Sequence, residues 1–176
     1  MTYPILTPLL MIDPLQQRDL EAFVEYRQDP DVARFQSWDT DYSNQQALEL
    51  IEGQIGIVFP DLDQWLQLAI RLRANYELVG DLAIHNLGKA KVEIGFTISK
   101  AFQRRGIARE AVGALVGVLE REFGTRELIA TPDSRNMASI KLLESLGFSE
   151  KPELSWWEDF KGERVQVLHY ALNIRR

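Results

Sequence analysis

Cysteine is absent from this chain of 176 residues. Its absence excludes disulfide bonds, thiolate metal sites and a cysteine nucleophile. Long apolar runs are missing as well, since no segment approaches the roughly 20 consecutive apolar residues of a membrane-spanning helix. Residues 1–11 contain neither Lys nor Arg, whereas a secretory signal peptide begins with a positively charged region. We therefore expect a soluble, cytoplasmic protein that has no membrane partner.

An excess of basic residues is also lacking. Lys and Arg number 20 against 26 Asp and Glu, which gives a net charge of −6. Nonspecific binding to nucleic acid depends on the neutralisation of phosphates by basic side chains, so we expect no nucleic-acid partner. The length is that of one ordinary domain. We therefore treat residues 1–176 as a single domain.

The charge is unevenly distributed along the chain. Between Asp13 and Asp63 there are 12 acidic and three basic residues, so this third carries a net charge of −9. Between Ser99 and Arg109 there are four basic residues and no acidic one. The acidic third is explained either by solvated helix faces or by a surface that attracts a cationic substrate. The basic segment is interrupted by Gly106, and this combination points to an anion-binding loop.

Hydrophobic periodicity predicts a mixture of strands and helices. Strands are expected over residues 4–12, 65–72, 78–84, 91–99, 127–130 and 165–172, with one more near 154–157. Helices are expected over residues 15–27, 43–55, 107–123 and 136–146, with a short one that follows a cap at Asp29. Asn136 can cap the 136–146 helix, whose expected inward-facing residues are Met137, Ile140, Leu143 and Leu146. This order predicts an α+β fold.

The segment from Glu93 to Arg109 runs from a predicted strand through the basic glycine loop into a predicted helix. The first N–H groups of a helix lack backbone partners and carry the positive end of the helix dipole. A glycine lets the backbone approach an anion closely, and arginines add charge, so this loop is suited to a pyrophosphate. Neither a Walker sequence nor Gly-x-Gly-x-x-Gly is present. An ordinary basic turn between a strand and a helix is the alternative.

The sequence Gln-Arg-Arg-Gly-Ile-Ala from Gln103 to Ala108 resembles the Gln/Arg-x-x-Gly-x-Gly/Ala signature of the GNAT superfamily of N-acetyltransferases. Residues 136–148, which begin Asn-Met-Ala-Ser and end Leu-Gly-Phe, are similar to the second cofactor helix of that family. The opening segments 9–20 and 29–35 resemble the Rim-type branch, the ribosomal-protein alanine acetyltransferases. The resemblance extends over nearly the whole chain.

This resemblance implies the GNAT fold, with a central mixed, mostly antiparallel sheet that is flanked by helices and splayed between its fourth and fifth strands. It also implies that acetyl-CoA, the cosubstrate, lies in the split, and that no metal takes part. The implied cofactor-binding residues are a strand whose backbone pairs with the pantetheine arm, the pyrophosphate loop and the start of the second cofactor helix: Phe96, Thr97 and Ile98; Gln103, Arg104, Arg105, Gly106, Ile107 and Ala108; Asn136 and Ser139. We expect a monomer or a homodimer.

Acetyl transfer to an amine needs a base for the amine proton and a hydrogen-bond donor for the tetrahedral oxyanion. Glu93 is the first candidate for the base, because a glutamate at a comparable place has this role in histone-type members of the superfamily. Histidine is suited to the same work at neutral pH, which makes His85 the second candidate, and Asp81 lies on the same face of the predicted strand. A strand N–H between Phe96 and Ile98 can stabilise the oxyanion.

The leaving thiolate can also be protonated by an acid. Many family members place a tyrosine for this purpose on the second cofactor helix, four residues before its glycine. Here Leu143 occupies that position, so the tyrosine mechanism does not transfer. Ser139 is the nearest hydroxyl on this helix, and it either protonates the thiolate or binds the cofactor. The thiolate can also leave unassisted, because a thiol has a pKa near 8.5.

The acceptor is expected to be a primary amine that receives the acetyl group directly within a ternary complex. An α-amine has a lower pKa than a lysine amine and is more easily neutral. Together with the Rim-type resemblance, this favours a protein N-terminal α-amine. A small cationic amine, such as a polyamine, an amino acid or an aminoglycoside, is one alternative. A non-catalytic module that only binds CoA is another, and the missing tyrosine favours it.

Overall fold

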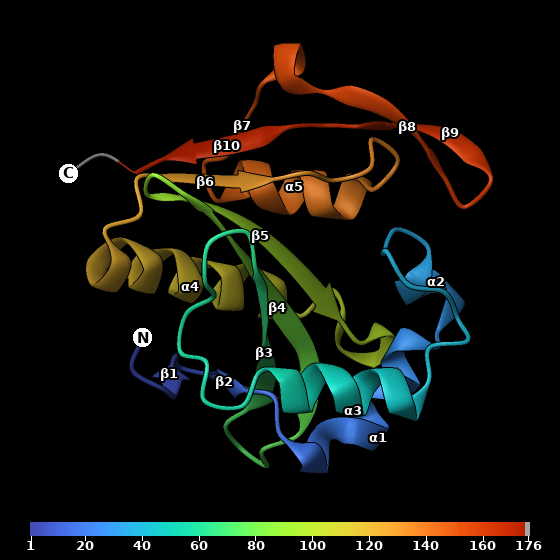
Figure 1. Cartoon of the computed structure of the whole chain (residues 1–176), viewed down its shortest axis with the longest axis vertical. Helices are drawn as coiled ribbons and strands as arrows, with labels where there is room; N and C mark the ends of the chain where they lie inside the picture. Colours follow the sequence, from blue (N-terminus) through green and yellow to red (C-terminus); the bar gives the residue numbers. More distant parts are fainter. Residues whose placement is uncertain (175–176) are drawn as a thin grey trace.

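The centre of the molecule is an eight-stranded sheet, seen in a computed structural model that describes residues 1–174. Its strand order is β1-β2-β3-β4-β5-β6-β10-β7 (Figure 1). Neighbouring strands are antiparallel except β5 and β6, which are parallel. The strands are β1 (Ile5–Leu6), β2 (Leu10–Pro14), β3 (Trp65–Leu72), β4 (Leu78–Gly88), β5 (Lys91–Ile98), β6 (Glu127–Ala130), β7 (Ser149–Glu150) and β10 (Tyr170–Asn173).

Helices cover both faces of this sheet. The α-helices are α1 (Leu20–Arg27), α2 (Pro30–Ala33), α3 (Asn44–Gly53), α4 (Ile107–Phe123) and α5 (Met137–Ser145), and short 3-10 turns lie at Gln17–Asp19, Lys100–Phe102 and Pro152–Leu154. One hydrophobic core joins α4 and α5 to the sheet, and a second core joins α1, α2 and α3 to the other face. Within residues 1–174, no helix combines the length and the hydropathy needed to cross a bilayer. The predicted α+β class is confirmed.

Several helix ends follow the expected capping chemistry. The Asp29 side chain accepts a hydrogen bond from the Asp31 N–H at the start of α2. Ser43 and Gln46 form a reciprocal capping box at the start of α3. The Asn136 side chain accepts from the Ser139 N–H at the start of α5. These polar side chains satisfy N–H groups that have no partner within their helices.

Two predicted strands are each split in two. The strand expected over residues 4–12 is a hairpin of β1 and β2, because the chain turns where the Thr7 N–H donates to the Leu10 carbonyl. The strand expected over residues 165–172 is divided into β9 (Glu163–Val167) and β10. β9 pairs with β8 (Trp156–Phe160) in a separate two-stranded sheet, and only β10 joins the main sheet. The strand expected near residues 154–157 begins at Trp156 and is β8.

One predicted core residue is also wrong. Met137 was expected to face inward, but 54% of its surface is exposed. It is the first residue of α5, and the buried residues of that helix are Ile140 and Leu143. The inward stripe therefore starts one turn later than the periodicity indicated.

The sheet is splayed where β5 and β6 meet. These strands pair only over Lys91–Glu93 and Glu127–Ile129. β6 ends at Ala130 and the chain departs towards α5, whereas β5 continues to Ile98. The remaining part of β5 therefore has no strand beside it on that edge. If β1 and β2 are counted as one strand, this gap lies between the fourth and fifth strands, as the resemblance implied.

Candidate active site

The free edge of β5 presents backbone hydrogen-bonding groups to the gap. The Ser99 N–H donates to the Val79 carbonyl of the neighbouring segment at 2.9 Å, and the register continues with Ile98 opposite Gly80. Hydrogen-bonded and non-hydrogen-bonded pairs alternate along an antiparallel ladder. The backbone groups of Phe96 and Ile98 must therefore point away from β4 and into the gap.

This register narrows the set of strand residues expected to pair with a cofactor. Thr97 lies opposite Asp81 in the ladder, so its N–H and carbonyl are directed at β4 and away from the gap. Gln103 donates from its side-chain amide to the Ile98 carbonyl at 3.0 Å. The free groups are therefore the N–H and carbonyl of Phe96 and the N–H of Ile98, and this register gives no support to the part expected of Thr97.

The basic loop ends at Gly106, which caps the start of α4. Gly106 has a φ of 78°, a left-handed conformation that favours glycine. A Cβ atom at this position would meet no other heavy atom within 4 Å, so the backbone conformation, and not crowding, accounts for the glycine. Glu110 is the first residue of α4 whose N–H bonds back to the Gly106 carbonyl. The N–H groups from Ile107 onwards in the first turn are thus available to an anion.

The side chains of this loop differ in their exposure and in the contacts that they make. Gln103, Arg104 and Arg105 are exposed, and the Gln103 amide is committed to the Ile98 carbonyl. The Arg105 guanidinium lies 5.1 Å from the centre of the Phe102 ring. Ile107 is buried in the core and anchors α4, and Ala108 is half-buried behind it. The arrangement presents two arginines and a helix start at one end of the gap.

The two candidates for the base, Glu93 and His85, are in contact. They lie directly opposite each other on β5 and β4, and His85 Nδ1 is 3.1 Å from Glu93 Oε2. The Thr131 hydroxyl donates to Glu93 Oε1 at 2.8 Å. His85 Nε2 lies 3.0 Å from Asp63 Oδ1, and the Trp65 ring stacks on the imidazole with 4.5 Å between ring centroids. Both oxygens of Glu93 are therefore held in place.

Asp63 and Thr131 were not anticipated from the sequence, although a signal for the His85–Glu93 contact was present. These two residues lie at equal distances along the chain from Lys89, at the turn between the two strands. A hairpin centred on that turn places them opposite each other. The partners Asp63 and Thr131 come from loops that precede β3 and follow β6, and no local pattern marks them.

Asp81 is not a candidate base. Its side chain is buried beneath α1, where it accepts a hydrogen bond from the Tyr26 hydroxyl at 2.6 Å and pairs with Arg27 at 3.3 Å. Burial raises the pKa of Asp81, while its hydrogen bonds and the Arg27 charge act in the opposite direction. The Arg27 guanidinium is itself packed on the Trp38 ring, 3.7 Å from its centre. Asp81 is therefore part of the core between the sheet and α1.

A second histidine lies near Glu93. His169 is 8% exposed, and its Nε2 has no hydrogen-bond partner within residues 1–174. Burial lowers the pKa of His169, and the charge of Lys91 lowers it further, whereas Glu127 and Glu93 act in the opposite direction. This side chain is therefore kept neutral more readily than an exposed histidine.

The acidic third of the chain does not form a surface for a cation. Half of its 12 acidic side chains are engaged: Asp13 and Asp19 with the buried Arg71, Asp31 with Lys100, Asp39 with Lys161, Asp63 with His85, and Asp29 as a helix cap. The others are exposed and scattered over helices and loops, namely Glu21, Glu25, Asp41, Glu49, Glu52 and Asp61. The reading as structural pairs and solvated faces is favoured over a cation-binding surface.

The start of α5 lies on the β6 side of the gap. Asn136 Oδ1 accepts from the Ser139 N–H at 3.2 Å, so this oxygen is used as a cap and the amide NH₂ remains for other partners. Ser139 is half-buried in the first turn of α5. Leu143, at the position where a tyrosine was considered, is fully buried in the core. The residues expected to bind a cofactor thus come from both sides of one gap.

Comparison with known proteins places the chain in a family. Residues 10–149 match the family described as acetyltransferase (GNAT) domain. The uncharacterized N-acetyltransferase p20 of Bacillus licheniformis is 24% identical to this chain, over 94% of this chain and 93% of that protein.

Solved structures share the fold. The spermidine N-acetyltransferase of Vibrio cholerae, determined with CoA and spermine, has a TM-score of 0.80 at 15% identity, over 93% of this chain and 95% of its own. The ribosomal L7/L12 α-N-protein acetyltransferase RimL, determined with CoA, has a TM-score of 0.79 at 16% identity, over 96% of both chains.

Proposed function

Since this chain belongs to the GNAT family, it is an acetyltransferase, and we propose that it transfers the acetyl group of acetyl-CoA to the N-terminal α-amine of a protein. The observation that carries this proposal is the free edge of β5 next to the start of α4. An unpaired strand edge suits the amides of a pantetheine arm, and free helix N–H groups suit a pyrophosphate. These two features lie at successive points of one gap.

Three groups of residues bind different parts of acetyl-CoA in this proposal. Phe96 and Ile98 offer backbone groups to the pantetheine arm, and the loop from Gln103 to Ala108 holds the pyrophosphate, with Arg104 and Arg105 adding positive charge. Asn136 and Ser139 contact the cofactor from the β6 side, and we assign Ser139 to binding. When bound, acetyl-CoA supplies an activated acyl group to the gap.

Glu93 is proposed as the general base that accepts the proton of the acceptor amine. Thr131 and His85 fix the orientation of its carboxylate through the hydrogen bonds to its two oxygens. The Phe96 N–H is proposed as the donor that stabilises the oxyanion of the tetrahedral intermediate. His85 is a positioning residue in this scheme, because it acts through Glu93. The base and the oxyanion donor lie on one strand, three residues apart.

A protein N-terminus is favoured over a polyamine as the acceptor. The solved structures of similar fold include enzymes named for each class, RimL and the spermidine N-acetyltransferase. A polyamine carries several positive charges and needs free carboxylates close to the site. In the acidic third of this chain, Asp31, Asp39 and Asp63 are already engaged with basic side chains. A single neutral α-amine makes no such demand.

Mass spectrometry of reaction products tests this proposal. The protein is incubated with acetyl-CoA and a panel of peptides with free N-termini, the same peptides with blocked N-termini and an internal lysine, polyamines, amino acids and aminoglycosides. We expect acetylation at the peptide α-amine and none on the blocked peptides. Acetylation restricted to the small amines would contradict the proposed acceptor. Binding of acetyl-CoA with no transfer to any amine would instead support the non-catalytic module.

A further inference from the structure

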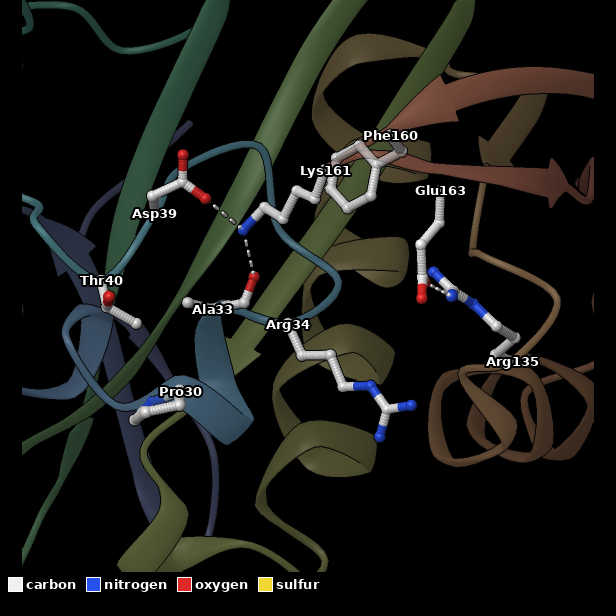
Figure 2. Close-up of a pocket in the computed structure, with 9 residues that line it drawn as sticks. All are labelled: Pro30, Ala33, Arg34, Asp39, Thr40, Arg135, Phe160, Lys161 and Glu163. Atoms are coloured by element: carbon white, nitrogen blue, oxygen red, sulfur yellow. Dashed lines mark hydrogen bonds and ion pairs between the residues drawn. The ribbon is translucent and has the colours of Figure 1, made fainter.

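A cavity of about 280 Å³ lies between α2 and the hairpin of β8 and β9. One wall comes from α2 and the residues that follow it, including Arg34 and Asp39. The other wall comes from the hairpin and from the segment before α5, with Arg135, Lys161 and Glu163. Figure 2 shows these two groups of side chains facing each other. The volume suits a side chain or another small group better than a folded segment.

The cavity lies at the open end of the gap between β5 and β6. Its first wall is tied to the loop after β5, because Asp31 in α2 forms an ion pair with Lys100. Its second wall includes Arg135, which lies in the connection from β6 to α5. α2 packs on the same side of the sheet as α1, and Asp81, His85 and Glu93 alternate onto that side. The α2 wall of the cavity therefore lies on the same side of the sheet as Glu93.

Two of the three basic side chains in the cavity are already neutralised. Lys161, at the tip of the hairpin, donates to the Ala33 carbonyl at 2.8 Å and pairs with Asp39 at 3.1 Å. Arg135 pairs with Asp133 at 2.7 Å and also with Glu163. Figure 2 marks the contacts of Lys161 and the Arg135–Glu163 pair. The two acidic residues that line the cavity, Asp39 and Glu163, therefore both form ion pairs with these two cations.

Arg34 differs from the other two cations in its contacts, although the charges around the cavity balance because Arg135 pairs with both Asp133 and Glu163. Within the described residues 1–174, the Arg34 guanidinium has no hydrogen bond or ion pair. It lies 5.0 Å from the centre of the Phe35 ring, and the Arg135 guanidinium lies 5.9 Å from the same ring. The carboxylate of Asp133 is occupied by Arg135, which holds the pKa of Asp133 low, and the Arg34 charge contributes to that shift. A planar set of N–H donors therefore remains available to an anion.

We propose that this cavity binds a carboxylate of the acceptor through Arg34. The inference rests on the proposed function and defines its substrate class: an amine whose molecule carries a carboxylate close by. For a protein N-terminus, this is an acidic side chain at the second or third position. The α-carboxylate of a free amino acid offers the same chemistry. A guanidinium suits either ligand, because its paired N–H groups match the two oxygens of a carboxylate.

This inference is tested by measuring the rate at which the CoA thiol is released with pairs of matched acceptors. One pair of amide-ended peptides differs only by Asp or Asn at position two, a second pair differs likewise at position three, and a third pair is alanine and alaninamide. For the wild-type protein we expect kcat/KM to favour the carboxylate member of at least one pair by up to about fivefold, because Arg34 is exposed and an exposed charge pair contributes only modestly. Arg34→Gln should remove this preference, and Arg34→Lys should keep part of it.

The control variant is Arg18→Gln, which removes an exposed arginine from the 3-10 turn before α1 and should leave every preference unchanged. A preference for the Asp peptides identifies a protein N-terminus with a nearby acidic side chain as the acceptor. A preference only for alanine over alaninamide identifies a free amino acid as the acceptor. Equal rates within every pair, or a preference that survives in Arg34→Gln, would overturn the inference while leaving the acetyltransferase function intact. Absence of transfer to any amine would overturn both.

Discussion

The imidazole of His85 and the carboxylate of Glu93 form a hydrogen-bonded pair across β4 and β5, with 3.1 Å between Nδ1 and Oε2. This contact gives the two side chains different roles. Glu93 lies on the strand that borders the gap, whereas His85 lies one strand further away. We therefore expect Glu93 to accept the proton and His85 to orient it.

Glu93→Gln should lower the turnover number by about 10²–10⁴-fold, the usual contribution of general acid–base catalysis. The affinity for acetyl-CoA should remain unchanged, because the amide preserves the shape of the side chain. The deficit should shrink as the pH rises, since more of the acceptor amine is then already neutral. Steady-state kinetics over a pH series measures this.

His85→Gln serves as the comparison and should show a smaller deficit, because Thr131 still holds the other oxygen of Glu93. A wild-type rate for Glu93→Gln at neutral pH would show that Glu93 is only a structural residue of the strand. The base would then be sought at His85 or at a bound water.

The double variant Arg104→Ala, Arg105→Ala should weaken the binding of CoA by up to about fivefold per arginine, because an exposed charge pair contributes roughly 0.2–1 kcal/mol. A pantetheine analogue without phosphates should bind almost as it does to the wild-type protein. Isothermal titration with the two ligands measures the difference, and Arg18→Ala is the control for removal of an exposed charge. Equal weakening for both ligands would argue against a role on the phosphates.

Asp81→Ala should destabilise the fold by about 3–5 kcal/mol, because it leaves the buried Arg27 guanidinium without its carboxylate partner. Urea unfolding measures this loss. At a temperature where the variant is still folded, its turnover number should remain close to that of the wild-type protein. A large loss of turnover with little loss of stability would return Asp81 to the candidates for the base.

The stability of the protein should fall as the pH drops through the ordinary histidine pKa of 6.5, in part because of His169. Burial lowers the pKa of His169 in the folded state, so the unfolded chain binds a proton there first and unfolding becomes more favourable. His169→Gln removes this contribution. The free energy of unfolding should therefore depend less on pH between 7.5 and 5 in this variant than in the wild-type protein. If the free energy of unfolding depends on pH equally in the variant and in the wild-type protein, His169 is not the group that causes the loss of stability.

Elements with clear flanking signals were predictable from the sequence. α4 and β6 begin and end where expected, because α4 has regular apolar spacing between Gly106 and Gly124, and Pro132 follows the end of β6. The hairpin of β1 and β2 was missed although Pro8 lies at its turn, and a proline inside a strand favours a break. No residue at positions 168–169 marks the break between β9 and β10, which arises because β9 pairs with β8.

The candidate site, like the fold, was predictable from the sequence only in part. The anion-binding loop could be located from Gly106 and its arginines, because the relevant residues are contiguous. The removal of Asp81 from the candidates could not be foreseen, because its partner Arg27 is 54 residues away in the chain. The position of Arg34, without an ion pair among residues 1–174, was equally hidden, since only the structure shows that Asp39 and Glu163 pair with Lys161 and Arg135.

Binding of acetyl-CoA to Gly106→Glu tests the central claim, that the start of α4 holds the pyrophosphate. Gly56→Glu is a matched control, because Gly56 has a φ of 80° against 78° for Gly106, and neither position has another heavy atom within 4 Å of a new Cβ. Both variants should suffer the same backbone strain, and both should remain folded by circular dichroism. Titration calorimetry should then show wild-type affinity for Gly56→Glu and no measurable binding to Gly106→Glu, whose carboxylate repels the phosphates. Wild-type affinity in Gly106→Glu would contradict the account.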